Sequence, residues 1–225
     1  MSKFTPGGLN LLNQLAANNN KDWFGAHRDE FKTQLQDPFA DLLESISFAM
    51  EVHDIRLKGS KKTMFRLHRD VRFSKDKTPY NLHISGMLTR GGTKTESGGG
   101  LYVRLDRDGG RLGCGHYGLD AKVLAPIRQK ILDRPNVYAD VLADLDAAGL
   151  ALDRENTLTT MPRGFSQYGD HPHASDLKLK SFTVFEALSA EDWLQDRVID
   201  KAVHMAQACQ KLLAFRDPFH HPKKI

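Results

Sequence analysis

The sequence has little of what marks secreted, membrane-spanning or disulfide-stabilised proteins. It contains two cysteines, Cys114 and Cys209, which are too few for a disulfide scaffold, so reduced thiols are expected. No apolar run approaches the roughly 18 residues that a membrane-spanning helix needs, and the first residues include no apolar segment of a secretory signal. We therefore expect a cytoplasmic protein that does not span a membrane.

Several motifs of well-known enzymes are also missing. The chain contains no P-loop, no Gly-x-Ser-x-Gly and no His-Glu-x-x-His pattern, which removes the most direct indications of an enzyme. Cys114 and His116 stand two apart, and His171, His173 and Asp176 form a second group of metal-ligating residue types. Neither group has a partner motif, so we expect no metal and no cofactor. The sequence does not decide whether the protein is an enzyme.

Acidic residues are scarce in one stretch of the chain. Between residues 56 and 94, eleven lysines and arginines stand against two acids, Asp70 and Asp76, which gives this stretch a formal charge of +9. The whole chain carries +4, so the remainder is acidic. Such a separation steers anions towards one part of a protein, whereas charges that only maintain solubility are interspersed.

Apolar spacing predicts three helices in the first fifty residues. The first carries Leu9, Leu12 and Leu15 and stops at the three asparagines of residues 18–20. Asp22 is expected to cap the second helix, and Pro38 to open the third. Helices are predicted again over 120–132, 136–148 and from Ser189 to Pro218. Pro126 is expected in the first turn of its helix, because proline disrupts a helix interior.

From about residue 63 to 117 the apolar period changes to two, which predicts antiparallel strands. Phe65 and Leu67, for example, alternate with charged neighbours, and Asp108-Gly109-Gly110 indicates a hairpin. We predict a single α+β domain over residues 1–225. A central antiparallel sheet of about five strands, from residues ~63–117 plus ~157–184, packs against N-terminal and C-terminal helices, and its other face holds a basic cleft.

Residues 65–80 combine the highest density of positive charge with turn-forming residues. Arginine's planar fork binds carboxylate and phosphate groups through two hydrogen bonds, and lysine adds a mobile charge. The predicted anion-binding residues are Arg66, Arg69, Arg72, Lys75 and Lys77, with Tyr80 and Arg104 as wall residues of the cleft.

An alternative interpretation is that these cations serve the structure alone. Arg69 would then pair with Asp70, or Arg72 with acids elsewhere, and Lys75 and Lys77 would solvate a turn. Three further cations, Arg163, Lys178 and Lys180, would join the cleft only if the fold brings them beside it.

Three functional hypotheses follow from this charge. The leading one is a cleft that binds a small molecule bearing a phosphate or carboxylate. The second is a nucleic-acid-binding module on the basic face of residues 56–94, with Phe65, Phe73 and Tyr80 as stacking partners. The third is a protein-interaction domain for acidic partners. The ligand's identity and the oligomeric state stay open.

Three segments together resemble a known family. They are residues 18–24 (Asn-Asn-Asn-Lys-Asp-Trp-Phe), the arginine-rich residues 65–80, and residues 113–117 (Gly-Cys-Gly-His-Tyr). They are similar to domain-of-unknown-function family 2461 of bacteria and fungi, over nearly the whole chain. Asn81 departs from the family pattern, in which lysine often follows the tyrosine. The resemblance implies one structural unit and carries over no catalytic residue, substrate or cofactor.

Overall fold

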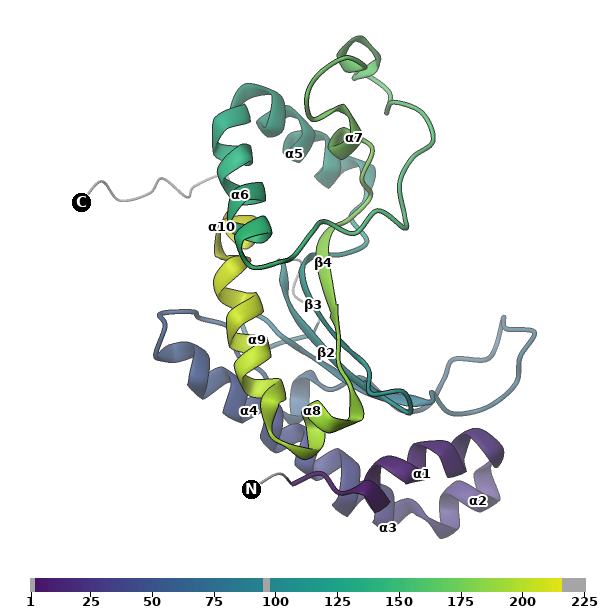
Figure 1. The fold of residues 1–225 in the computed structure, drawn as a ribbon. Helices are drawn as coiled ribbons and strands as arrows, with labels where there is room; N and C mark the ends of the chain where they lie inside the picture. Colours follow the sequence, from purple (N-terminus) through teal and green to yellow (C-terminus); the bar gives the residue numbers. More distant parts are fainter. Residues whose placement is uncertain (1–2, 95–97, 216–225) are drawn as a thin grey trace. The chain divides into compact units, whose positions relative to one another are not determined.

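A computed structural model describes residues 3–94 and 98–215 and shows an α+β fold (Figure 1). One antiparallel sheet has the strand order β1-β2-β3-β4, so the predicted fold class is confirmed, with four strands in the described residues where about five were expected. The strands are β1 (His83–Leu88), β2 (Gly100–Asp106), β3 (Arg111–His116) and β4 (Phe182–Ala187). As predicted, a tight hairpin containing Gly109 and Gly110, both with positive φ, joins β2 to β3.

The described residues divide into two compact units. Unit 1 contains the residues up to Gly113 together with Glu186–His204, and unit 2 contains Cys114–Phe185 and the residues from Met205 onward. The prediction of a single domain over 1–225 stays a prediction. No helix in the described part of the chain is both long and apolar enough to cross a membrane.

Most helices of unit 1 precede the sheet in the sequence. They are α1 (Pro6–Ala17), α2 (Lys21–Ala26), α3 (Arg28–Phe31), the π-helix η1 (Lys32–Gln36), α4 (Asp37–Glu51) and the 3-10 helix η2 (Lys61–Thr63), followed near the C-terminus by α8 (Ala190–Leu194) and the first part of α9 (Arg197–Ala208).

The core of unit 1 forms where α4 packs against β1. Gly86 of β1 permits this contact, because a Cβ atom there would lie 2.6 Å from Cδ1 of Leu43. The Trp193 ring of α8 lies 6.2 Å from the Phe39 ring of α4 and 5.2 Å from that of Phe4. Helices from both ends of the sequence therefore contribute to one apolar core, as predicted.

Unit 2 is built from helices that follow β3. They are α5 (Ala121–Asp133), α6 (Pro135–Ala147), the 3-10 helix η3 (Ser166–Tyr168), α7 (Ala174–Leu177) and α10 (Gln210–Phe215). The fully buried Tyr138 of α6 lies at their centre, with its ring 4.9 Å from that of His173 and 5.4 Å from that of Phe215.

Two predicted helix starts need correction. Asn20, not Asp22, caps α2, because the Asn20 side chain accepts a hydrogen bond from the Trp23 N–H. Asp120 caps α5 by accepting from the Val123 N–H, which places Pro126 inside the helix and not in its first turn. Both capping residues have extended backbone, and the side-chain oxygen of each accepts a hydrogen bond from the N–H three residues later.

The predicted long C-terminal helix is interrupted. Asp196 has φ of +57° and separates α8 from α9, because a left-handed residue cannot continue a right-handed helix. The helix start predicted at Ser189 is confirmed, because Ser189 and Asp192 form a capping box at the start of α8. Pro218, the predicted end, lies outside the described residues, as does the pair His220 and His221.

The strand expected at Phe65 and Leu67 is also wrong. In the structure this segment contains no extended strand, only the isolated bridges Met64↔Gly86 and His68↔Tyr80. The Phe65 N–H donates to the Ser85 carbonyl over 2.8 Å, so the segment touches the edge of β1 and then leaves it. The alternation of apolar and charged residues around Phe65 therefore corresponds to a short stretch of pairing with β1.

Gly115 offers a test of the close packing at β3. Its φ is +127°, and a Cβ atom there would lie 2.1 Å from the carbonyl oxygen of Phe182. We expect Gly115→Ala to lower the free energy of unfolding by about 3 kcal/mol or more. Gly118→Ala is the control, because Gly118 has φ of +62° with nothing near its Cβ position and should lose only about 1 kcal/mol. Urea unfolding measures both, and equal losses would contradict the packing.

Candidate anion-binding surface

The arginine-rich segment forms a closed loop of residues 68–80, here called the basic loop. The bridge between His68 and Tyr80 joins its ends. The Arg69 N–H donates to the Pro79 carbonyl over 2.8 Å, next to this bridge. The base of the loop is therefore held by backbone hydrogen bonds and needs no long strand.

Tyr80 anchors the basic loop to the helices of unit 1. Asn19 Nδ2 donates to the Tyr80 carbonyl over 2.9 Å, and the Tyr80 N–H donates to Asn19 Oδ1 over 3.1 Å. The Tyr80 ring lies 4.2 Å from that of Phe24 and 4.8 Å from that of His68, and the residue is only 4% exposed. Tyr80 therefore packs in the core, which leaves it little surface for the predicted role in a ligand pocket.

Arg69 is bound within the basic loop. Its Nη1 lies 2.5 Å from Asp76 Oδ2 and 3.1 Å from the Thr78 carbonyl, and it also donates to the Thr78 hydroxyl. The Asp76 carboxylate in turn accepts from the Thr78 N–H over 2.9 Å. That backbone hydrogen bond, followed by the one from Arg69, lowers the pKa of Asp76 to about 2.

Arg72 is also paired. Its Nε and Nη2 donate to the two carboxylate oxygens of Asp70 over 2.9 and 2.7 Å. These bonds lower the pKa of Asp70 and raise that of Arg72. Lys77 Nζ donates to the Val71 carbonyl over 2.9 Å. Both arginines thus form ion pairs, as the structural interpretation expects, although Asp70 pairs with Arg72 and not with Arg69.

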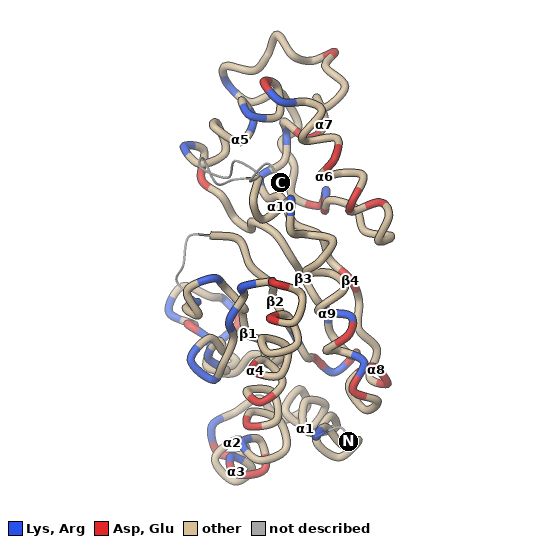
Figure 2. The backbone as a smooth tube through the Cα atoms, turned by 90° about the vertical axis from the view of Figure 1, so that its left-hand side faces the viewer, with Lys and Arg blue, Asp and Glu red and all other residues tan. Residues whose placement is uncertain are grey.

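Arg56 and Lys61 of the basic stretch also pair with acids, Asp54 and Asp37, but four other cations form no ion pair among the described residues. Lys58, Lys62, Arg66 and Lys75 are exposed, and none lies within ion-pair distance of a carboxylate among the described residues. Figure 2 shows lysines and arginines gathered in the loops beside β1. Two exposed rings accompany them, Phe65 and the 95% exposed Phe73. We call these four cations and two rings the basic surface.

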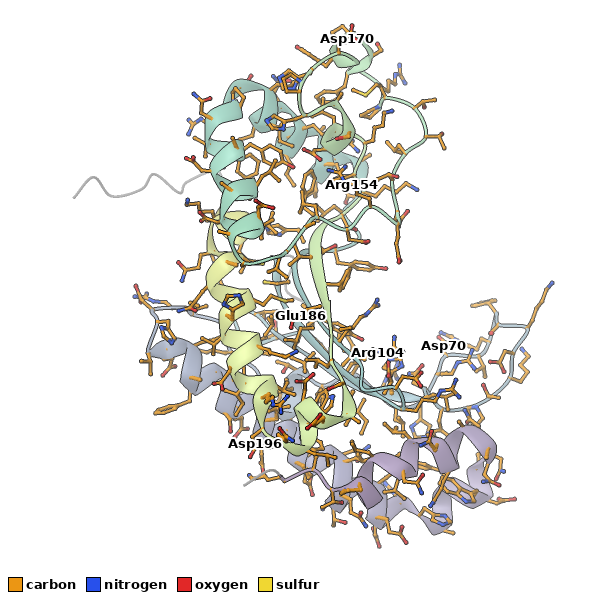
Figure 3. All side chains as sticks on the ribbon, in the orientation of Figure 1. Asp70, Arg104, Arg154, Asp170, Glu186 and Asp196 are labelled. Atoms are coloured by element: carbon orange, nitrogen blue, oxygen red, sulfur yellow. The ribbon has the colours of Figure 1, made fainter. Side chains whose placement is uncertain are left out.

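Arg104 lies on β2 and is labelled in Figure 3. It pairs across the sheet with Ser85, and its Nε is 3.0 Å from Asp106 Oδ2. The neighbouring His83 has a lowered pKa, mainly because it is partly buried and also because Arg104 is positive. Among the described residues, no hydrogen bond or ion pair links Arg104 to the basic loop.

Cys114 and His116, the two residues of the chain considered as a possible nucleophilic pair, are buried. A hydrogen bond with Cys209, followed by burial, raises the pKa of the Cys114 thiol well above its usual value, which opposes formation of the reactive thiolate. His116 is buried too, with Nε2 3.2 Å from the Leu212 carbonyl. The pair therefore contributes to the packing of unit 2.

The group of His171, His173 and Asp176, whose residue types could ligate a metal, has an arginine beside it. Asp176 is buried, with Oδ1 2.6 Å from Arg154 Nη2 and Oδ2 3.5 Å from His173 Nδ1 (Figure 3 shows Arg154). Arginine supplies the positive charge that a metal ion would bring. In the described part of the chain, no group of three or more His, Cys, Asp or Glu residues is arranged to hold a metal.

Residues 113–118 match one further enzyme motif, the glycine pattern of dinucleotide-binding loops. They read Gly-Cys-Gly-His-Tyr-Gly, the Gly-x-Gly-x-x-Gly of dinucleotide-binding loops, where the glycines lie in a turn that follows a parallel strand. Here Gly113 and Gly115 lie within β3 of an antiparallel sheet. The close approach of Phe182 to Gly115 indicates that this glycine serves strand packing.

The titration of Asp76 tests the geometry of the basic loop. Its pKa in the folded chain lies below the ordinary value of 3.8, so the stabilisation is complete above that pH and is lost as the pH falls through about 2. We expect the carboxyl carbon's NMR shift to titrate near pH 2. Arg69→Gln should raise the midpoint, whereas Thr78→Ser should leave it unchanged because both Thr78 donors are kept. A wild-type midpoint at the ordinary value would refute the arrangement.

Comparison with known proteins adds a family to this description. Neither the curated proteins nor the solved structures contained a match to the chain. A family described as "Conserved hypothetical protein (DUF2461)" matches residues 8–215, which include Asn19, the basic loop and most of both units. The chain therefore belongs to the DUF2461 family, as its three segments of resemblance suggested.

Proposed function

We propose that the protein binds single-stranded nucleic acid through the basic surface. The observation that carries this proposal is the combination of Lys58, Lys62, Arg66 and Lys75, all exposed and in no ion pair with a described carboxylate, with the exposed rings of Phe65 and Phe73. Cations that follow a phosphate backbone and aromatic rings that stack on bases are the two elements of sequence-tolerant single-strand binding.

The pairing inside the basic loop favours a polyanion over a small ligand at this surface. Two of the three arginines predicted to bind a small phosphate or carboxylate, Arg69 and Arg72, already bind Asp76 and Asp70. Displacing those carboxylates would cost part of the binding free energy. A nucleic acid can instead contact the free cations one phosphate at a time.

Phe73 supports the same proposal. Its ring is 95% exposed, and the Arg72 guanidinium carbon lies 5.9 Å from the ring centre. A single exposed ring is ordinary on a protein surface. A ring next to an arginine within the basic loop, however, provides a face on which a base can stack while its phosphates meet positive charge.

Removing two free cations tests the electrostatic part. We expect Arg66→Gln with Lys75→Gln to reduce the salt dependence of oligonucleotide binding. The slope of log K against log salt should fall by roughly 1.4, because each single-strand phosphate contact contributes about 0.7. Fluorescence anisotropy of a labelled single-stranded oligonucleotide over a range of salt concentrations measures the slope.

The matched control removes the same charge from unit 2. Lys122 and Arg134 are exposed and outside the basic surface, so Lys122→Gln with Arg134→Gln should leave the slope unchanged. Equal effects of the two double variants would mean that oligonucleotide binding depends on the net charge of the protein and not on the basic surface. Binding of an acidic peptide without binding of any oligonucleotide would refute the proposal in favour of a protein partner.

Phe73→Ala tests the stacking part. Because a stacked base contributes about 1–3 kcal/mol, affinity for the oligonucleotide should fall by about 5- to 150-fold while the salt slope stays the same. Tyr117→Ala is the control, since Tyr117 is 75% exposed but belongs to unit 2. Unchanged affinity in Phe73→Ala would remove the ring from the site.

A further inference from the structure

A separate pocket lies wholly within unit 2 and has a volume of about 530 Å³, within the range of small-molecule sites. Its walls are formed by the segment before α5, by α5 itself, by the loop of residues 158–165 and by Lys180. Most of the lining is apolar, and its charged residues are Arg128, Arg163 and Lys180. No acidic side chain lines it.

Arg128 is the most informative of the three cations. It is 4% exposed, its Nε donates to the Leu177 carbonyl over 2.6 Å, and its Nη2 donates to the Leu179 carbonyl over 3.0 Å. Its Nη1 makes no hydrogen bond to any described residue, and no described carboxylate lies within ion-pair distance. Burial lowers the pKa of Arg128, although a guanidinium stays charged in proteins. A buried cation without an anion is costly.

The other two cations lie at the more open parts of the pocket. Arg163 is exposed and Lys180 is half-buried. Neither side chain has a hydrogen-bond or ion-pair partner among the described residues. Like charges that line one cavity repel each other, and a bound anion would relieve both this repulsion and the missing partner of Arg128.

We propose that this pocket binds an amphipathic small molecule, with an oxyanion head held by Arg128, Arg163 and Lys180 and an apolar body against the remaining wall. The apolar wall is formed by Leu119, Leu124, Leu158, Met161 and Phe165. The ligand class is a carboxylate on an aryl or alkyl body, because a compact planar head matches the fork of an arginine. The site shares no residue with the basic surface and does not depend on nucleic-acid binding.

Isothermal titration calorimetry with the full chain tests the pocket, with 4-phenylbutyrate as the probe. We expect saturable binding with one site per chain. The neutral 4-phenylbutan-1-ol and inorganic phosphate, which each lack one half of the chemistry, should bind at least tenfold more weakly. The phosphate ester of 4-phenylbutan-1-ol shows whether the head group is a carboxylate or any oxyanion, and a clear preference for the ester would overturn the carboxylate assignment.

Variants locate the binding. Arg163→Gln with Lys180→Gln should weaken 4-phenylbutyrate about tenfold or more without changing the alcohol. Ala125→Phe should block both probes, because Ala125 is an exposed pocket residue of α5 whose enlargement fills the cavity. Lys122→Gln on the same helix, outside the lining, should bind normally. Arg128→Met is avoided as the sole test because it removes the donor of two backbone carbonyls.

The outcomes separate the proposal from its rivals. Absence of 4-phenylbutyrate binding, or equal affinity for the alcohol, would overturn it, and so would full affinity in the doubly substituted variant. Oligonucleotide binding by the same variant provides the distinction from the basic surface. It should be unchanged, because Arg163 and Lys180 belong to unit 2 and the basic surface to unit 1.

Discussion

The double hydrogen bond between the Asn19 side chain and the backbone of Tyr80 is the constraint on which the rest of unit 1 depends. It ties the linker between α1 and α2 to the end of the basic loop, 61 residues further along the chain. An amide side chain is suited to this task, because it presents one donor and one acceptor at the spacing of a backbone N–H and carbonyl. With Tyr80 fixed, its ring meets Phe24 and the following chain enters β1 in register.

The sequence predicts those features of the fold that depend on near neighbours. Gly149 ends α6 with φ of +70°, the Ser189 capping box begins α8, and the glycines after Asp108 form the hairpin. Each signal acts within three residues, so it can be read from the sequence without knowledge of the fold. The two acids inside the basic stretch also limited the choice of partners for Arg69 and Arg72, although not which pair would form.

Features that depend on distant residues could not be predicted. The alternation at Phe65 and Leu67 is the same for an extended strand and for one bridge at a sheet edge, because side-chain periodicity does not reveal how long the pairing lasts. Arg128 shares a helix face with Leu124, Ile127 and Ile131, but the carbonyls of Leu177 and Leu179 to which it donates are about fifty residues away in the sequence. The walls of the pocket come from residues between 119 and 180. Tyr80 was predicted as a wall residue of the cleft because the sequence does not show that the fold buries its ring.

The basic loop is satisfied by its own residues, and this has an energetic consequence for any partner. The bridge of His68 with Tyr80 joins the ends of the loop, and ion pairs orient the side chains of Arg69 and Arg72. Ordering a flexible loop at the moment of association would consume about 0.5–1.5 kcal/mol for each immobilised long side chain. Folding has already met that cost for Arg69 and Arg72, so on association it remains for the side chains, such as Arg66 and Lys75, that form no ion pair among the described residues.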